Sequence, residues 1–251
     1  MNTSVARVAA LYDIHGNLPA LEAVLEQVRE AAVDHIVVGG DVLPGPMARE
    51  TMQCLLNLPF PVDFIYGNGE VAVLEHLAGR TPARVPEQYR PAIQWAAEQV
   101  HDCQSVLASW PMTMGLQIDG MGEVLFCHAT PRNEDECFTR LTPDERLRPV
   151  FDGLGAAVVV CGHTHMQFDR LVGKTRIVNA GSMGMPFGEP GADWLLLGPD
   201  VQLQHTPYDL QKAAERIRGT MFPWPEDFAT RYILQPPSAA EMLDLFTRAS
   251  I

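Results

Sequence analysis

The sequence predicts an α/β protein in which two mixed β-sheets pack face to face and are covered on the outside by helices. Two observations support this fold class. Strand and helix patterns alternate over residues 5–68, which indicates parallel strands joined by right-handed crossovers. After residue 115 the expected strands follow one another with short turns, which favours antiparallel or mixed pairing.

The first part of the chain contains three expected strands and two expected helices. Residues 5–12 form an apolar run and are expected to be a buried strand. Apolar residues spaced three and four apart over 18–32 predict a helix with one buried face. A second strand is expected at 35–39, a helix at 47–57 and a third strand at 62–66.

The middle and end of the chain have a different organisation. Residues 70–110 carry two helical stretches, three prolines and no clear strand, so we expect a small helical cap. Strands are then expected at 115–118, 123–127, 156–161, 167–172, 175–179, 193–197 and 201–205. The C-terminal helices at about 208–251 are expected to be one at 208–219 and a final one that Ser238 and Glu241 would open as a capping box. No internal repeat occurs, and we expect one domain over 1–251.

Composition narrows the functional class. The chain has 251 residues, 47% hydrophobic, and a formal net charge of -13 without any dense Lys/Arg run, which argues against a nucleic acid polymer as partner. No run of about 18 apolar residues occurs, so no membrane partner is expected. Five scattered cysteines and the lack of a signal-peptide pattern lead us to expect a cytoplasmic protein with reduced thiols.

Five short motifs, each placed after an expected strand, hold seven potential metal ligands. They are Asp13-Ile14-His15, Gly40-Asp41, Gly67-Asn68, His128 and Gly162-His163-Thr164-His165. Strand ends are where α/β sheets form ligand sites. Four imidazoles, two carboxylates and one amide oxygen suit Mn, Fe, Ni or Zn better than Ca or Cu(I), and Mn is the favoured ion.

The spacing within the motifs predicts shared ligation. Asp13 and His15 are two residues apart, as are His163 and His165, and such pairs share one face of a regular strand. Two metal ions about 3.5–4 Å apart would lower the pKa of a bridging water and orient a phosphoryl group for attack by hydroxide. Each motif alone has a simpler explanation, such as a buried core histidine at position 128. Their conjunction favours a metal site.

The order of the motifs resembles the calcineurin-like metallophosphoesterase superfamily, and most closely its small bacterial and archaeal phosphodiesterase branch. The resemblance spans about residues 7–209 and implies a four-layer αββα fold. It implies one metal ion on Asp13, His15, Asp41 and His165, and a second on Asp41, Asn68, His128 and His163. Asp41 would bridge the two ions.

One position departs from the family pattern. Many relatives carry a histidine directly after Gly-Asn that is proposed to protonate the leaving group, whereas this chain has Gly69. We therefore expect phosphodiesters and activated esters to be better substrates than alkyl monoesters. The expected catalytic residues are Asp41, Asn68, His128 and Arg132. Arg132 could reach a phosphate oxygen, or could simply pair with a neighbouring acidic residue, Glu134 or Asp135.

Other residues have two readings. Asn17 could bind substrate or make the turn after His15, and Glu70 could orient a metal ligand or, more simply, cap a helix. The Phe222–Trp224 run is better explained as a hydrophobic anchor than as a substrate platform. Thiolate ligation by Cys127 or Cys161 is conceivable, but buried strand cysteines are the simpler explanation.

The expected function is metal-dependent hydrolysis of small phosphate esters by an activated hydroxide. One alternative is a phosphomonoesterase or nucleotidase on the same site. Another is a non-catalytic protein-binding scaffold, since a retromer subunit with this fold has a degraded metal site. Retention of all seven ligand positions opposes the scaffold reading.

Overall fold

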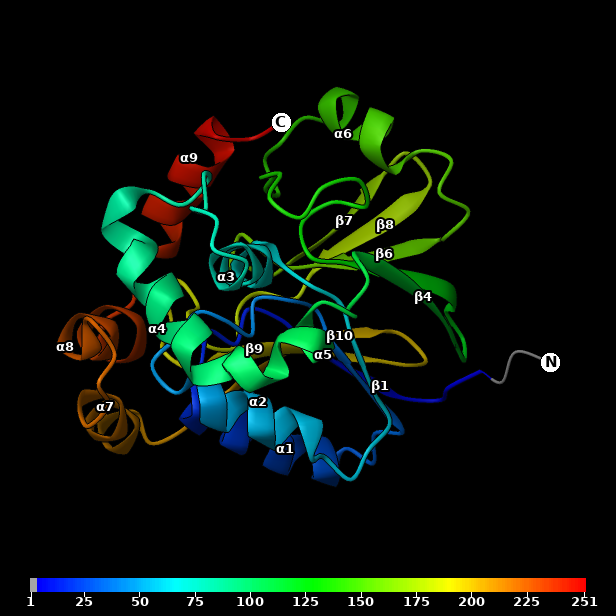
Figure 1. Ribbon diagram of the computed structural model, residues 1–251. Coiled ribbons are helices and arrows are strands. Elements are labelled where there is room, and N and C mark those ends of the chain that lie inside the picture. Colours follow the sequence, from blue (N-terminus) through cyan, green and yellow to red (C-terminus); the bar gives the residue numbers. More distant parts are fainter. Residues whose placement is uncertain (1–3) are drawn as a thin grey trace.

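The computed structural model describes residues 4–251 and contains two five-stranded mixed sheets (Figure 1). The first sheet has the order β10-β9-β1-β2-β3. Its strands are β1 (Val8–Leu11), β2 (His35–Val38), β3 (Val62–Phe64), β9 (Ala192–Leu197) and β10 (Val201–Thr206). Strands β1, β2 and β3 run parallel, whereas β9 is antiparallel to both β1 and β10.

The second sheet has the order β4-β5-β6-β8-β7. Its strands are β4 (Thr113–Ile118), β5 (Gly122–Cys127), β6 (Val158–Cys161), β7 (Phe168–Val172) and β8 (Thr175–Asn179). The three central strands are parallel, and the two edge strands pair antiparallel with their neighbours. The prediction of two mixed sheets is therefore confirmed.

The two sheets bury their facing sides against each other. Val8 and Ala10 of β1 belong to the same apolar cluster as Phe126 of the second sheet. Ala9 and Leu11 point to the opposite side, where they join the cluster formed with the covering helices. Because β1 is buried on both faces, its sequence is continuously apolar rather than alternating.

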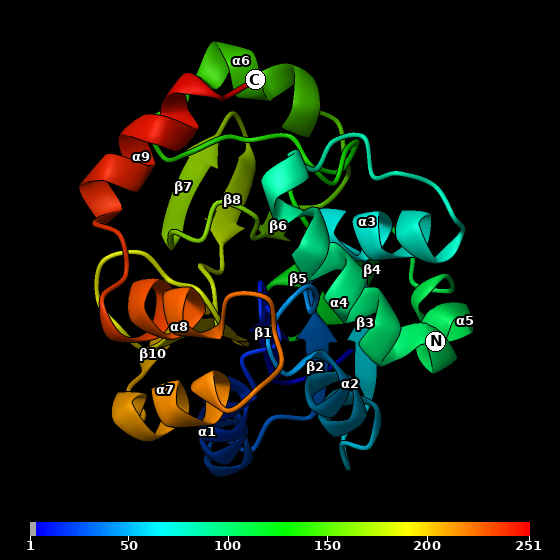
Figure 2. The ribbon, with the colours of Figure 1, turned by 60° about the vertical axis from the view of Figure 1, so that its left-hand side comes forward.

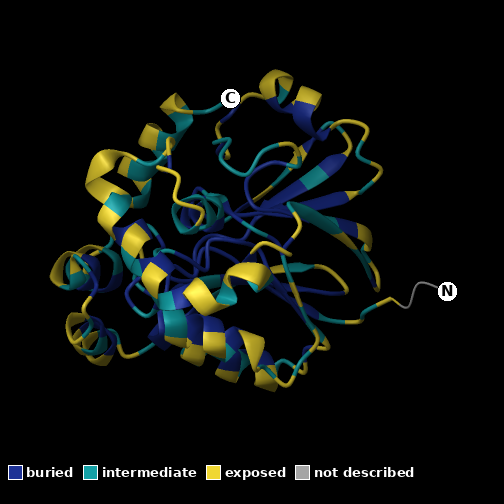
Figure 3. Ribbon diagram, viewed as in Figure 1, coloured by how far each residue is buried: buried dark blue, intermediate teal, exposed yellow. Residues whose placement is uncertain are grey.

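Helices cover the outer faces, and buried residues concentrate in the strands between them (Figure 3). Helices α1 (Leu18–Glu30) and α2 (Ala48–Leu56) pack on the first sheet. Helix α6 (Asp144–Phe151) packs on the second sheet. No helix within residues 4–251 is both long and apolar enough to cross a membrane.

Two helical segments frame one side of the molecule (Figure 2). The insert consists of α3 (Asn68–Leu77), η1 (Glu87–Tyr89), α4 (Arg90–Val100), η2 (His101–Cys103) and α5 (Gln104–Leu107). The C-terminal segment consists of α7 (Leu210–Arg218), α8 (Pro225–Phe228), the π-helical η3 (Ala229–Leu234) and α9 (Ala239–Arg248). Ala92 of the insert packs in one cluster with Phe222 and Phe228. The two segments are therefore in contact.

Candidate metal centre

The carboxyl ends of five strands, three in the first sheet and two in the second, bring the predicted ligands together. Asp13 and Asp41 follow β1 and β2 of the first sheet, and His128 and His163 follow β5 and β6 of the second. Asn68 is the first residue of α3, after β3. Because the facing sheets end at the same place, ligands from distant parts of the sequence converge.

Most of these ligands have an unusual backbone conformation. Positive φ angles occur at Asp13 (52°), His15 (47°), Asp41 (50°), His163 (67°) and His165 (57°). Ala32 is the only other non-glycine residue among 4–251 with positive φ. Such residues cost on the order of 1–3 kcal/mol each and cluster at functional sites. The paired ligands lie beyond the ends of their strands, so left-handed turns, and not the shared strand face we expected, bring them together.

The glycines of the motifs are required by close packing between loops. A Cβ atom at Gly40 would lie 2.6 Å from the backbone nitrogen of Gly67. A Cβ atom at Gly67 would lie 2.2 Å from Oδ1 of Asp41. The Gly-Asp and Gly-Asn pairs therefore reflect two loops that approach each other directly beneath the candidate ligands.

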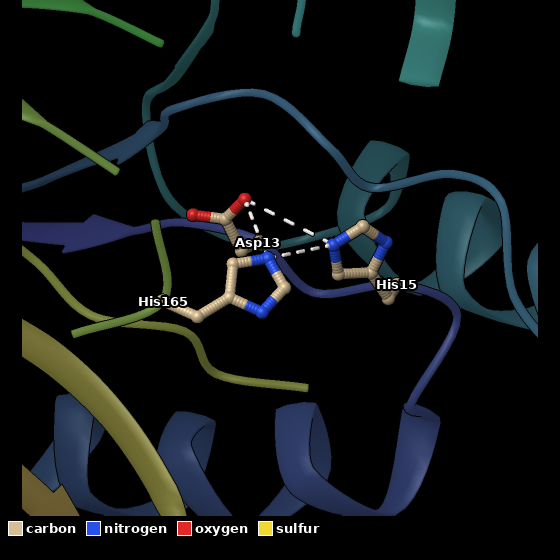
Figure 4. A group of neighbouring side chains, drawn as sticks. All are labelled: Asp13, His15 and His165. Carbon is tan, nitrogen blue, oxygen red and sulfur yellow. Dashed lines mark hydrogen bonds and ion pairs between the residues drawn. The ribbon is translucent and has the colours of Figure 1, made fainter. Parts of the chain in front are cut away.

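One group of candidate ligands contains Asp13, His15 and His165 (Figure 4). The two Nε2 atoms of His15 and His165 are 3.2 Å apart. Oδ1 of Asp13 lies 3.3 Å from Nε2 of His165 and 3.9 Å from Nε2 of His15. All three residues are buried. One cation among these atoms would contact all three side chains.

A second group contains Asp13, Asp41 and His128. Nε2 of His128 lies 3.5 Å from Oδ1 of Asp41, 3.8 Å from Oδ1 of Asp13 and 3.2 Å from Oδ1 of Asn68. The His163 ring lies 5.3 Å from the His128 ring, centroid to centroid. The seven predicted ligands thus gather in one place.

Hydrogen bonds orient three of the imidazoles. Their Nδ1 atoms lie close to backbone carbonyls: His128 to Gly39 at 2.9 Å, His165 to Met185 at 2.9 Å and His15 to Pro44 at 3.4 Å. Donation from Nδ1 leaves the Nε2 lone pair directed at the centre, which is the arrangement of a metal-binding histidine. Two such lone pairs 3.2 Å apart repel unless a proton or a metal ion lies between them. Oδ1 of Asp13 is also buried without a hydrogen-bond partner within residues 4–251. The donor set therefore fits divalent metal ions.

The electrostatics of the centre are dominated by its two carboxylates. Burial would lower the pKa of His128, but Asp41 and Asp13 outweigh it and raise that pKa to about 10. Burial and the neighbouring His128 lower the pKa of His163 to about 4. Burial would raise the pKa of Asp41, yet His128 and His15 hold it well below its usual range. The carboxylates are therefore ionised at neutral pH and attract positive charge.

Glu70 connects the loops that carry Asp41 and Asn68. Its buried carboxylate accepts N–H bonds from Asp41 (2.8 Å), Leu43 (3.0 Å) and Gly67 (2.8 Å). The Gly67 bond caps α3 and the other two hold the Asp41 loop, so both readings of Glu70 apply. Burial and the Asp41 charge raise the pKa of Glu70 to about 7.

Arg132 pairs with Glu136, and not with Glu134 or Asp135 as the sequence had suggested. Its Nε atom is 3.0 Å from both carboxylate oxygens of Glu136, and it does not line the cavity that opens at His15 and Asp41. Arg84 of the insert does line that cavity. No motif surrounds Arg84, so the sequence contained no signal for it.

Two other polar residues have structural surroundings that clarify their roles. The buried Asn17 accepts a bond from the Ala20 nitrogen and donates to the Gly184 carbonyl, so it makes the turn that begins α1. Sγ of Cys137 lies 3.4 Å from Nε2 of His163. Cys127 and Cys161, the two cysteines for which ligation was conceivable, are instead fully buried, and the Cys127 thiol contacts backbone carbonyls.

Residues 7–198 match the profile of the calcineurin-like phosphoesterase superfamily domain, and the chain belongs to this superfamily. It is 27% identical over 238 residues to an uncharacterized protein of Methanocaldococcus jannaschii, covering 86% of this chain and 93% of the relative.

Two solved structures share the fold. A metallophosphoesterase from Sphaerobacter thermophilus is 25% identical, with a TM-score of 0.68 and coverage of 91% of this chain and 98% of the other. A hypothetical protein from Pyrococcus horikoshii is 20% identical, with a TM-score of 0.78 and coverage of 92% and 99%. The latter resemblance concerns the fold alone.

Proposed function

We propose that this protein hydrolyses small phosphate esters, with phosphodiesters preferred, at a centre of two divalent metal ions. The observation that carries the proposal is the convergence of two Nε2 atoms 3.2 Å apart beside an unpartnered, buried Oδ1 of Asp13. When bound, two such ions supply an activated nucleophile at neutral pH and positive charge for the phosphoryl oxygens. Mn is the favoured ion, followed by Fe, Ni or Zn.

Asp41 is proposed to lie between the two ions. Its Oδ2 is 3.8 Å from Nε2 of His15, while its Oδ1 is 3.5 Å from Nε2 of His128. The first ion would be held by Asp13, His15, Asp41 and His165, and the second by Asp41, Asn68, His128 and His163. Glu70 holds the backbone of the Asp41 loop in place through two N–H bonds. The chain thereby orients its ligands before any ion binds.

The preference for diesters and activated esters rests on Gly69. Its backbone N–H donates to Oδ1 of Asp41 at 2.7 Å, and a Cβ atom there would lie 2.0 Å from the Leu43 carbonyl oxygen. No imidazole can occupy this position without moving the loop. A leaving group that departs without a proton donor must carry its own negative charge, so acidic alcohols leave faster.

The substrate is proposed to be small, and a nucleic acid polymer is not expected because the net charge is -13. The five cysteines are free, which supports a reducing, cytoplasmic location. A phosphomonoesterase or nucleotidase would use the same centre. A non-catalytic scaffold is disfavoured because all seven ligand positions are retained and converge.

Metal analysis of the purified protein, combined with a panel of phosphomonoesters, phosphodiesters and cyclic nucleotides, tests the proposal. We expect two ions per chain and a rate with Mn that falls steeply as the leaving-group pKa of aryl phosphodiesters rises. A flat rate across that series, with product release excluded as the slow step, would mean that another residue donates the proton. Absence of bound metal together with no hydrolysis would favour the scaffold.

A further inference from the structure

A cavity of about 370 Å³ opens at the candidate metal centre and runs between the insert and the C-terminal segment. His15, Asp41 and Asn68 contribute to its lining. A volume of this size lies within the range of small-molecule sites. The cavity therefore has room for the organic part of an ester whose phosphate lies at the metal centre.

Aromatic side chains form much of the remaining wall. They are Tyr89, Phe222, Trp224, Phe228 and Tyr232. Among the aromatic residues of Ser4–Ile251, Tyr89 and Trp224 are the most exposed, at 54% and 36%. They come from different segments, yet both line this cavity. Exposed apolar side chains gathered at one place mark a binding surface.

The C-terminal wall is held rigidly. Phe222 packs edge-to-face on Trp224, with ring centroids 6.1 Å apart, and on Phe228, with centroids 5.9 Å apart. Phe222 and Phe228 are buried, so they anchor the segment as the sequence suggested. Trp224 instead remains exposed at the cavity. An anchored, rigid aromatic wall binds a flat partner with little loss of side-chain entropy.

A second observation marks the same wall as functional. Tyr232 lies in η3, a π-helical segment, and such segments are rare and occur frequently at functional sites. The C-terminal wall also lies outside residues 7–198, which match the superfamily domain. This part of the cavity is thus an addition to the phosphoesterase core.

We propose that this cavity binds a flat aromatic ring, an aryl group or a nucleobase, in the organic part of the ester. The assignment rests on the proposed function, because that function places the phosphate at the metal centre. Aromatic side chains stack on or pack edge-to-face against flat rings. A saturated ring of the same size fills the same volume without this geometry. One stacked ring should raise kcat/KM roughly tenfold.

The test compares phenyl p-nitrophenyl phosphate with cyclohexyl p-nitrophenyl phosphate. Both release p-nitrophenol, and the ratio of their Mn-catalysed rates without protein corrects for the stronger electron withdrawal of phenyl, so the remaining difference reports the flatness of the second group. After this correction we expect roughly tenfold higher kcat/KM for the phenyl ester. Trp224→Ala should bring this ratio close to one. Met221→Ala is the matched control, since Met221 is 82% exposed in the same segment and does not line the cavity.

Binding of phenylphosphonate and cyclohexylphosphonate, measured by calorimetry, separates the two proposals. Tighter, Trp224-dependent binding of phenylphosphonate without hydrolysis of any ester would overturn the proposed function and support the aromatic cavity. Equal kcat/KM for both esters together with equal binding of the two phosphonates, or preference for a long-chain alkyl ester, would overturn the aromatic cavity and leave the phosphoesterase. If the aromatic cavity is supported, a thymidine p-nitrophenyl phosphate is compared with the phenyl ester. A higher kcat/KM for the thymidine ester would identify the ring as a nucleobase, and a lower kcat/KM would identify it as a simple aryl group.

Discussion

Asp41 shows how one side chain connects the two halves of the candidate centre. Its carboxylate reaches His15 on one side and His128 on the other, at 3.8 and 3.5 Å. We expect Asp41→Asn to remove at least one metal ion and to lower phosphodiester turnover by more than roughly 100-fold. Mutation of a residue that only hydrogen-bonds to a metal ligand already lowers metal affinity or activity by roughly 10–100-fold. Metal content and kcat are the measurements.

Asp63→Asn is the matched control for this change. Asp63 lies on β3 of the same sheet, and its half-exposed side chain pairs with His35 at 2.8 Å. This variant should keep both ions and its turnover. Two tightly bound ions and near-normal turnover in Asp41→Asn would exclude Asp41 as the bridging ligand.

Close packing against Leu43 explains why position 69 is a glycine in this chain and not the histidine of many relatives. Gly69→His would force a Cβ atom to within 2.0 Å of the Leu43 carbonyl, so the loop must move. We expect a loss of about 3 kcal/mol in the free energy of unfolding and no gain with poor leaving groups. Urea unfolding and a leaving-group series measure the two effects.

Gly219→Ala is the control for Gly69→His, because its Cβ would meet no atom closer than 3.4 Å. It should unfold at nearly the same urea concentration as the parent. A Gly69→His variant that is fully stable and hydrolyses alkyl esters faster would show that the loop accepts an imidazole.

The sequence predicted which residues come together at the candidate centre, but not how their side chains are oriented. Their identity followed from short motifs after strand ends. The left-handed turns at Asp13 and His163, and the carbonyls that fix the Nδ1 atoms, depend on loops that are distant in sequence. Arg84 and Cys137 approach the centre only through tertiary packing. No local pattern could have indicated either.

Among the elements, α3 depends on one buried carboxylate at its N-terminus. Glu70→Gln replaces an acceptor oxygen by an NH₂ group, so at least one of the three N–H groups loses its partner. We expect a loss of about 1–3 kcal/mol in the free energy of unfolding. Metal affinity should fall by roughly 10–100-fold because the Asp41 loop is less well held. Chemical denaturation and calorimetric metal titration measure the two effects.

Glu75→Gln on the same helix is the control, because Glu75 is only partly buried and its side chain makes no hydrogen bond within residues 4–251. It should behave like the parent. Unchanged stability together with unchanged metal affinity in Glu70→Gln would contradict the positioning role of Glu70.

The order of the elements was largely predictable, with two omissions. Continuous apolar runs marked strands that are buried on both faces, such as β1, and apolar periodicity marked the long helices, which bury one face. Helix α6 was missed because it is short, follows Pro143 and contains Pro149. Segment α8–η3 was missed because a π-helix does not follow the 3.6-residue period.

At the level of the whole molecule, local sequence patterns do not determine which sheet each strand joins. Strands β9 and β10 join the first sheet through pairing of β9 with β1, across most of the chain. Such pairing depends on which apolar surfaces match after collapse. The sequence therefore indicated two mixed sheets but not the strand order within them.

Because the carboxylates of the centre attract positive charge, the free energy of unfolding of the metal-free protein should depend on pH. Asp41 and Asp13 raise the folded-state pKa of His128 from 6.5 to about 10 against the effect of burial. The protonated ring then stabilises the metal-free fold fully below about pH 6.5, and this contribution is lost as pH rises toward 10. We expect metal-free protein in EDTA to lose roughly 2–3 kcal/mol of unfolding free energy between pH 7 and 9.

Metal binding should show the opposite trend, because only neutral imidazole can bind an ion. An ion that replaces the proton on His128 releases it, so affinity should rise with pH over the same interval. Calorimetric titration at pH 7.5 in two buffers of different ionisation enthalpy should detect about one proton released from His128. His128→Gln should abolish both the released proton and the pH-dependent loss of metal-free stability. The contrary result would be a free energy of unfolding in EDTA that stays level or increases from pH 7 to 9. That result would mean that His128 is neutral beside Asp13 and Asp41, and that the two carboxylates do not hold a proton on its ring.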